Sequence, residues 1–69
     1  MKSRHVGSFA GLEVVRLSRT DWRVSERNVP EQLLGYIERQ RADRYEVLWM
    51  TDPMHWGYAG SFEEALAAF

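Results

Sequence analysis

The pattern of the last twenty-five residues, 45–69, constrains the fold of this chain more than any other feature. Apolar residues alternate, a turn pair follows, a second short alternating stretch comes next, and a capped helical pattern closes the segment. The turn pair is Asp52 and Pro53: the aspartate accepts hydrogen bonds from later backbone N–H groups and the proline presets φ. The segment therefore predicts strand, turn, strand and helix, without a single lysine or arginine.

The predicted helix begins at Ser61. The Ser61 hydroxyl can accept from the N–H of Glu64, whose carboxylate can reach back to the serine N–H, as in a capping box. The apolar residues of the segment recur at helical spacing: Phe62, Ala65, Leu66 and Phe69. Because isolated helices shorter than about 12 residues are marginal in water, we expect Phe62, Leu66 and Phe69 to anchor this helix on a sheet.

A first hairpin is predicted from a change of phase in the apolar alternation. Val15 and Leu17 share one parity, whereas Trp22 and Val24 share the other, so one straight strand would place them on opposite faces. A tight turn or bulge near 19–21 resolves this, with strands over 12–18 and 22–25. Arg16 and Arg23 then lie away from the apolar positions.

The stretch 32–50 admits a helix or a second hairpin. A helical stripe through Leu33 and Ile37 would bury almost nothing between Glu38 and Arg44, and Gly35 would cost it up to about 1 kcal/mol. The pattern therefore favours strands over 33–39 and 45–51 joined by a polar loop at 40–44. The loop lacks the glycine or asparagine that tight turns prefer.

The remaining segments complete the expected architecture. Residues 1–11 show no period and predict a flexible N-terminal arm, and residues 26–32 predict a connection that contains Pro30. Residues 54–60 predict a short edge strand with Trp56 and Tyr58 on one face. In the preceding strand, Val47 shares its face with Tyr45 and Trp49. The expected fold is one α+β domain over 12–69: a small antiparallel sheet with one short C-terminal helix packed on one face.

Length and charge narrow the classes of function. A chain of 69 residues buries only about 60% of its unfolded surface. Without cysteine it has neither a disulfide nor a thiolate metal site, so a homodimer is expected to help stabilise it.

All nine basic residues lie at or before Arg44, which leaves residues 45–69 with a charge of −4. This layout and a pI of 6.1 disfavour broad nucleic-acid binding. No apolar run is long enough to span a bilayer and no secretory signal is evident, so we expect a cytoplasmic protein.

The sequence offers few groups for enzyme chemistry. The two histidines are His5 in the predicted arm and His55 in a predicted turn, where Asp52 and Glu63 are the nearest candidate carboxylates. This spacing is common and forms no triad, no zinc signature and no phosphate-binding loop. We therefore expect no enzyme activity, no metal, no cofactor and no small-molecule substrate.

Two resemblances add expectations. The succession of strands closed by Gly60, Ser61, Phe62, Glu63, Glu64 and Ala65 resembles AP2-type and integrase-arm DNA-binding domains over roughly residues 33–69. That resemblance implies arginines and tryptophans on an exposed sheet face that enters the major groove. The matching basic residues here are Arg39, Arg41 and Arg44, and no lysine or arginine follows them in the chain. The chain is also similar to small uncharacterised proteins of high-GC Gram-positive bacteria. That similarity rests on residues 22–25, 34–38 and 62–66 and implies no known activity.

Two functions follow as expectations. The first is a non-enzymatic module that acts through protein contacts or self-association, because aromatic residues are abundant in so small a core. Its candidate surface consists of Trp22, Trp49 and Trp56. The alternative is weak nucleic-acid binding. Its candidate contacts are Arg16, Arg23, Arg39, Arg41 and Arg44.

Overall fold

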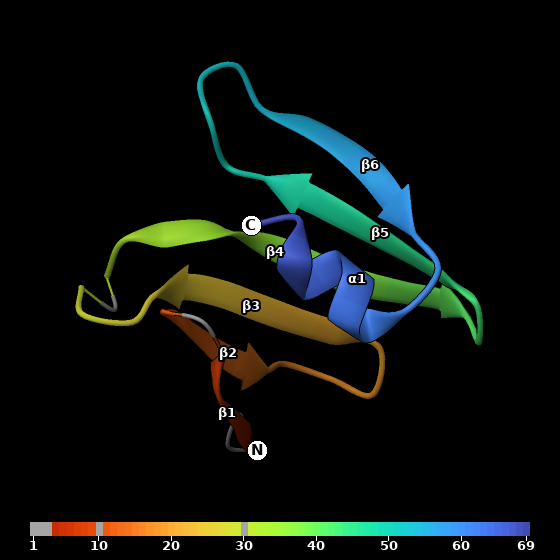
Figure 1. Ribbon diagram of the computed structural model, residues 1–69, viewed down its shortest axis with the longest axis horizontal. Helices are drawn as coiled ribbons and strands as arrows, with labels where there is room; N and C mark the ends of the chain where they lie inside the picture. The colour runs from red at the N-terminus through yellow and green to blue at the C-terminus, as the bar shows by residue number, and fades with distance from the viewer. Residues whose placement is uncertain (1–3, 10, 30) are drawn as a thin grey trace.

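The protein forms one antiparallel sheet of six strands followed by one short helix, as seen in the computed structural model (Figure 1). The structure describes residues 4–9, 11–29 and 31–69. The elements in chain order are β1 (Arg4–Phe9), β2 (Leu12–Arg16), β3 (Asp21–Glu26), β4 (Leu33–Arg41), β5 (Arg44–Trp49), β6 (His55–Ala59) and α1 (Phe62–Ala67). Each strand pairs with its neighbour in sequence, so β1 and β6 are the edges. The predicted α+β class and the edge position of the last strand are confirmed.

The N-terminal segment differs from the predicted flexible arm. Residues 4–9 form β1, which pairs with β2 in antiparallel register. The register shifts between His5 and Gly7, and an interrupted strand of this kind leaves no regular alternation in the sequence. Residues 1–3 and 10 of the predicted arm lie outside the described residues. The described part of the sheet therefore reaches Arg4, ahead of the boundary predicted at residue 12.

Both predicted hairpins are present, with different turns. β2 and β3 pair through five consecutive residues, and the 17–20 turn joins them. The turn between β4 and β5 contains only Ala42 and Asp43, so the predicted five-residue loop at 40–44 is wrong. A register shift between Arg39 and Arg41 accompanies this turn. The bulge provides the extra local twist that lets a two-residue turn close without glycine.

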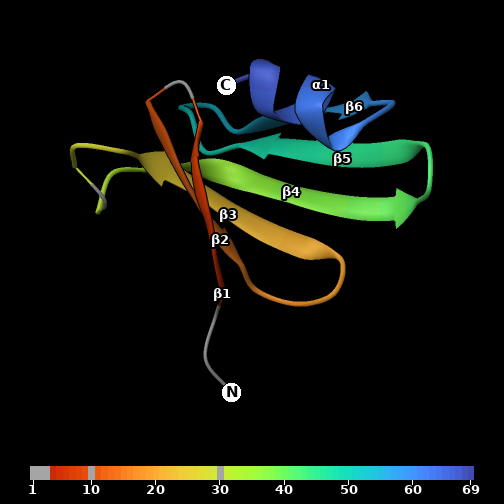
Figure 2. The same ribbon diagram turned by 60° about the horizontal axis from the view of Figure 1, so that its bottom comes forward.

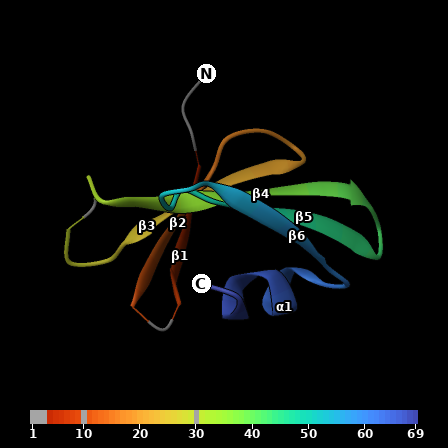
Figure 3. The same ribbon diagram turned by 90° about the horizontal axis from the view of Figure 1, so that it is seen from above.

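The core lies between one face of the sheet and α1. Its fully buried side chains come from four adjacent strands: Val14, Val24, Ile37 and Val47. Ala65 and Leu66 of α1 complete the buried cluster. Figure 3 shows α1 on this face alone, with β1 and β2 bent toward the same side. The sheet thus buries one face, which we call the helix face, and leaves an open face opposite.

The helix begins after the predicted N-cap, Ser61, and one of its two capping hydrogen bonds differs from the prediction. The Ser61 hydroxyl accepts from the Glu64 N–H at 3.1 Å, but the Glu64 carboxylate accepts from the N–H of Gly60 at 2.6 Å, not from that of Ser61. Phe62 packs between Trp22 and Tyr45, with ring centroids 4.8 and 6.1 Å away. These contacts hold the first turn of the helix against β3 and β5, and Figure 2 shows α1 next to β5 and β6.

The end of the chain packs over β4 and β5. Phe69 lies 6.2 Å from Trp49, measured between ring centroids, and the indole N–H of Trp49 donates to the Ala68 carbonyl at 3.1 Å. Leu66 is buried and Phe62 and Phe69 pack against the core, so the three predicted anchors are confirmed. Nowhere in the described ranges is there a helix with the length and apolar character needed to cross a membrane.

Candidate functional site

The open face of the sheet takes no part in the hydrophobic core. Strand alternation places it opposite Trp22, Ile37 and Val47, which lie on the helix face. The register then aligns one residue from each of five strands in a continuous row. This row, which we call the aromatic row, is Val15, Arg23, Tyr36, Leu48 and Trp56.

The apolar side chains of the aromatic row are most exposed on β6. Tyr36 and Leu48 are half-buried by their neighbours within the sheet, whereas Trp56 is 62% exposed. Tyr58, on the same face of β6, is 55% exposed. Contiguous exposed apolar patches are typical of interaction sites, and Trp56 and Tyr58 lie two residues apart on the same face of β6. No helix or strand of the described ranges covers this face (Figure 3).

A second row, parallel to the first, is acidic. Its members, which we call the acidic row, are Asp21, Glu38 and Glu46, and the row ends on Tyr58. Glu38 and Glu46 stand directly opposite each other on neighbouring strands. Like charges in this position are destabilising, while Asp21 is held by the hydroxyls of Ser18 and Thr20. The open face therefore presents apolar and negatively charged groups side by side.

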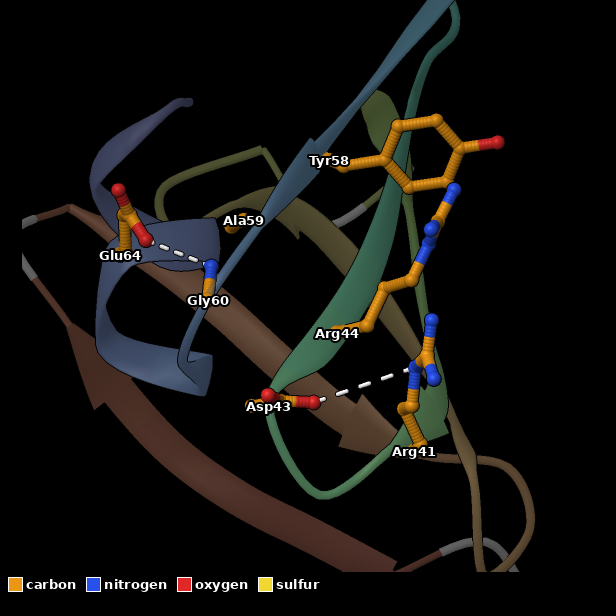
Figure 4. A pocket seen from close by; sticks show the side chains of 7 residues that line it. All are labelled: Arg41, Asp43, Arg44, Tyr58, Ala59, Gly60 and Glu64. Carbon is orange, nitrogen blue, oxygen red and sulfur yellow. Dashed lines mark hydrogen bonds and ion pairs between the residues drawn. The ribbon is translucent and has the colours of Figure 1, made fainter.

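Two arginines meet at the β4–β5 hairpin. Arg41 and Arg44 face each other across the turn, and the Arg44 guanidinium carbon lies 4.1 Å from the centre of the Tyr58 ring (Figure 4). This is a close cation–π geometry, which is worth about 0.5 to 1 kcal/mol at an exposed site. The Arg44 Nε is buried without a hydrogen-bond partner among the described residues. The stack on Tyr58, not a hydrogen bond from Nε, holds the side chain.

These residues border a shallow cleft at the same end of the sheet. The cleft has a volume of about 540 Å³. It is lined by Arg41, Asp43, Arg44, Tyr58, Ala59, Gly60 and Glu64. Asp43 lies 4.0 Å from the Arg41 guanidinium, and Glu64 holds the Gly60 N–H on the helix side (Figure 4). Basic and acidic side chains are thus mixed in the lining of the cleft, so the lining has no large patch of a single charge sign.

The other predicted arginines do not join this pair. Arg16 lies on the helix face, 5.7 Å from the centre of the Trp22 ring, and donates to the carbonyls of Ser18 and Arg19, so it braces the 17–20 turn. Arg23 stands exposed in the aromatic row. The backbone of Arg39 donates to the Thr20 carbonyl, and the residue faces Tyr45 on the helix face. The structure therefore divides the five candidate contacts between both faces.

The three tryptophans do not share a surface either. Trp22 and Trp49 are half-buried on the helix face, and only Trp56 lies on the open face. Of the three predicted tryptophans, Trp56 alone belongs to the open face. The residues that lie with it there are Tyr36, Leu48 and Tyr58. Strand parity pairs Trp56 with Tyr58 in the sequence, but the alignment with Tyr36 depends on interstrand register, which no local pattern specifies.

The residues considered for acid–base chemistry are also separated. His55 stacks on Trp49 at 4.7 Å and its Nδ1 lies 3.1 Å from the Thr51 hydroxyl, so neither Asp52 nor Glu63 is the group paired with it. In the part of the chain that the structure describes, no three side chains of histidine, aspartate or glutamate gather as metal ligands.

Comparison with known proteins gives no match: no family model, no curated protein and no solved structure matches the chain.

Proposed function

We propose that this protein is a non-enzymatic, cytoplasmic interaction module that binds a protein partner through the open face of its sheet. The observation that carries the proposal is the aromatic row, with Tyr36, Leu48 and Trp56 aligned across three strands and Tyr58 beside it. Interface cores are enriched in tyrosine and tryptophan. A domain of this size that leaves Trp56 on its surface forgoes apolar burial that its core would otherwise use.

The acidic row specifies the chemistry of the partner. Glu38 is exposed and Glu46 is half-buried, and the two carboxylates stand opposite each other. A partner that brings a lysine or arginine against this pair would relieve the repulsion between them. The best-fitting partner is therefore a protein segment with apolar side chains flanked by basic ones.

The proposal is tested by site-specific crosslinking followed by measured binding. An aromatic photo-crosslinking residue replaces Tyr36 at the centre of the open face, and in a second variant it replaces Glu63 on the exposed side of α1. The expected result is a protein adduct of defined mass from position 36 alone. The identified partner is then titrated against wild type, Glu38→Lys and Glu63→Lys, which carry the same change on opposite sides of the molecule.

We expect Glu38→Lys to weaken binding at least about tenfold, which corresponds to about 1.4 kcal/mol, and Glu63→Lys to leave it unchanged. Equal adducts from both positions, or equal affinities of the two lysine variants, would refute binding through the open face. Amide spectra of each variant establish that the fold is intact.

Nucleic-acid binding is the second candidate, favoured by one observation and by the AP2-type resemblance. Arg41 faces Arg44 across the turn, and the Arg44 guanidinium carbon lies 4.1 Å from the centre of the exposed Tyr58 ring. Stacking next to arginine is one way in which single strands are held without sequence preference. The acidic row beside them opposes it. A titration with single-stranded and duplex DNA near 50 mM salt, followed by amide shifts, decides the matter. Amide shifts at Arg41 and Arg44 that vanish in a variant with both Arg41→Gln and Arg44→Gln would favour nucleic-acid binding. The absence of amide shifts at both residues in wild type would rule it out.

A further inference from the structure

The edge strand β6 has backbone groups that face away from the sheet, and the hydrogen bonding of β5 identifies them. The Met50 N–H donates to the Leu34 carbonyl, toward β4, at 2.9 Å. Met50 directly follows β5, and backbone groups of successive strand residues point to opposite sides. The even residues of β5 therefore bond to β4, and the odd residues bond to β6. Val47 is one of them, and its partner on β6 is Gly57. The inward positions of β6 are therefore the odd ones.

The outward positions of β6 are Trp56 and Tyr58. Their N–H and C=O groups, four in all, point to the side of β6 where no strand of the described ranges lies. Both side chains are among the most exposed apolar ones of the described residues. The same two residues thus offer free backbone groups and uncovered aromatic surface.

Nothing in β6 protects this edge from pairing. Natural sheets blunt their edges with lysine, proline or bulges; the five residues of β6 include no lysine, arginine or proline, and their register with β5 does not shift. The opposite edge, β1, does carry a register shift, between His5 and Gly7. The two edges therefore differ, and β6 is the one suited to accept another strand.

We propose that β6 pairs with β6 of a second copy of this chain, antiparallel, about a two-fold axis at Gly57. In this register Trp56 of each copy lies opposite Tyr58 of the other. All four outward backbone groups of each strand are then satisfied, because each Trp56–Tyr58 pair exchanges two hydrogen bonds. An interface of this kind is isologous: the same patch serves both subunits, which is the commonest symmetry of soluble dimers.

The side chains support the same register. Two Trp56–Tyr58 pairs would flank the axis on the open face, and aromatic cross-strand pairs stabilise a sheet. Gly57, at the axis, has no side chain to obstruct the approach. Met54, which is 53% exposed, would lie opposite Gly60 of the second copy, beside the stack of Arg44 on Tyr58. The five residues of β6 include no lysine, arginine, aspartate or glutamate that would repel its own copy.

The size of this contact sets its strength. A pair of five-residue strands with these side chains buries less than the roughly 800 Å² per partner of a standard interface. The expected dissociation constant is therefore about 10 to 500 μM, weaker than that of a permanent dimer. The inference goes beyond the proposed function, because pairing at the edge of β6 does not depend on a partner bound to the open face.

The oligomeric state is measured by sedimentation equilibrium from about 10 μM to 1 mM. Wild type is expected to pass from monomer to dimer over this range. Trp56→Pro is expected to remain monomeric, because proline removes an outward N–H without touching the hydrogen bonds to β5. Val29→Lys, which replaces another exposed apolar residue in the loop after β3, is the control and should dimerise like wild type. Amide spectra of both variants check that they fold.

The register is tested by disulfide trapping, since the chain contains no cysteine of its own. Trp56→Cys and Tyr58→Cys are oxidised separately and as a mixture. Directly opposed residues lie about 5.5 Å apart between Cα atoms, within reach of a disulfide, whereas position 56 is too far from position 56 of the other copy. The mixture should crosslink at least about tenfold faster than either variant alone.

Three results would overturn the inference: wild type that is monomeric at 1 mM, a dimer unaffected by Trp56→Pro, or faster crosslinking within one cysteine variant than in the mixture. Its failure is distinguishable from that of the proposed function. A monomer whose open face still binds a partner in a Glu38-dependent manner removes the dimer alone. A dimer that binds no partner removes the proposed partner surface alone.

Discussion

At Gly35 the sheet lies in close contact with the end of the chain. A Cβ atom at this position would overlap the Leu48 carbonyl oxygen and come within 2.7 Å of Cε1 of Phe69. The backbone oxygen cannot move without disturbing the pairing of β4 with β5. Gly35 is thus fixed by packing, although in the sequence it reads only as a residue that argues against a helix.

Gly35→Ala is therefore expected to destabilise the protein by about 3 kcal/mol, at the upper end of the cost of overpacking. Gly60→Ala is the matched control, since its Cβ would meet the flexible Glu64 carboxylate at 3.3 Å, and should lose less than about 1 kcal/mol. Urea unfolding followed by tryptophan fluorescence measures both. Equal losses would show that neither the Leu48 carbonyl oxygen nor Phe69 constrains Gly35.

Ser61 is the second residue with a single, separable role. Its hydroxyl satisfies the Glu64 N–H at the start of α1, so Ser61→Ala should cost about 1 kcal/mol. Ser61→Asp keeps an acceptor at the N-cap and should retain most of the stability. Thermal unfolding of the three proteins measures the difference; an aspartate variant as unstable as the alanine variant would argue against the capping role.

At the scale of elements, the β4–β5 hairpin contains a built-in repulsion between Glu38 and Glu46. Glu38→Lys turns it into an attraction, and the expected gain in unfolding free energy is about 0.2 to 1 kcal/mol. The gain should shrink in 0.5 M salt because exposed charges are screened. Urea unfolding at low and high salt tests this. A variant that is more stable but binds its partner less well is the pattern expected where stability is given up for function.

The elements also show how far the sequence predicts this fold. The phase change between Leu17 and Trp22 identifies the first hairpin, and Ser61 with Glu64 identifies the helix start, because both signals depend on residues a few positions apart. β1 is missed because its register shift removes the alternation, and the turn at Ala42–Asp43 is missed because a bulge, not a turn residue, closes it.

The candidate site is less predictable than the elements. Strand parity places Trp56 and Tyr58 on one face, but the alignment of Trp56 with Leu48 and Tyr36 depends on the register of three strands. The contact between Arg44 and Tyr58 likewise joins two strands. Such pairings are decided by the packing of the opposite face on α1, which is a property of the whole sheet.

At the scale of the whole molecule, pairing of β6 with a second copy links stability to concentration. A ligand that binds only the folded state stabilises it by mass action, and a second subunit is such a ligand. The thermal midpoint of wild type should rise between about 10 μM and 1 mM protein, by about 4 to 8 °C for each kcal/mol gained. The midpoint of Tyr58→Lys should stay constant, as calorimetry at both concentrations can show; a concentration-dependent midpoint in that variant would point to another interface.

The strand order also bears on how the chain reaches its structure. Because β1 to β6 pair strictly with their chain neighbours, the sheet needs no crossover, and each pairing closes only a short loop. Short loops are closed at low entropic cost, and sheets made of local hairpins fold faster than sheets with distant pairings. The chain can add one hairpin at a time as it leaves the ribosome, with α1 docking last. The edge at β6 is therefore completed only when synthesis of the domain is nearly finished, so two nascent chains have little opportunity to pair before each has folded.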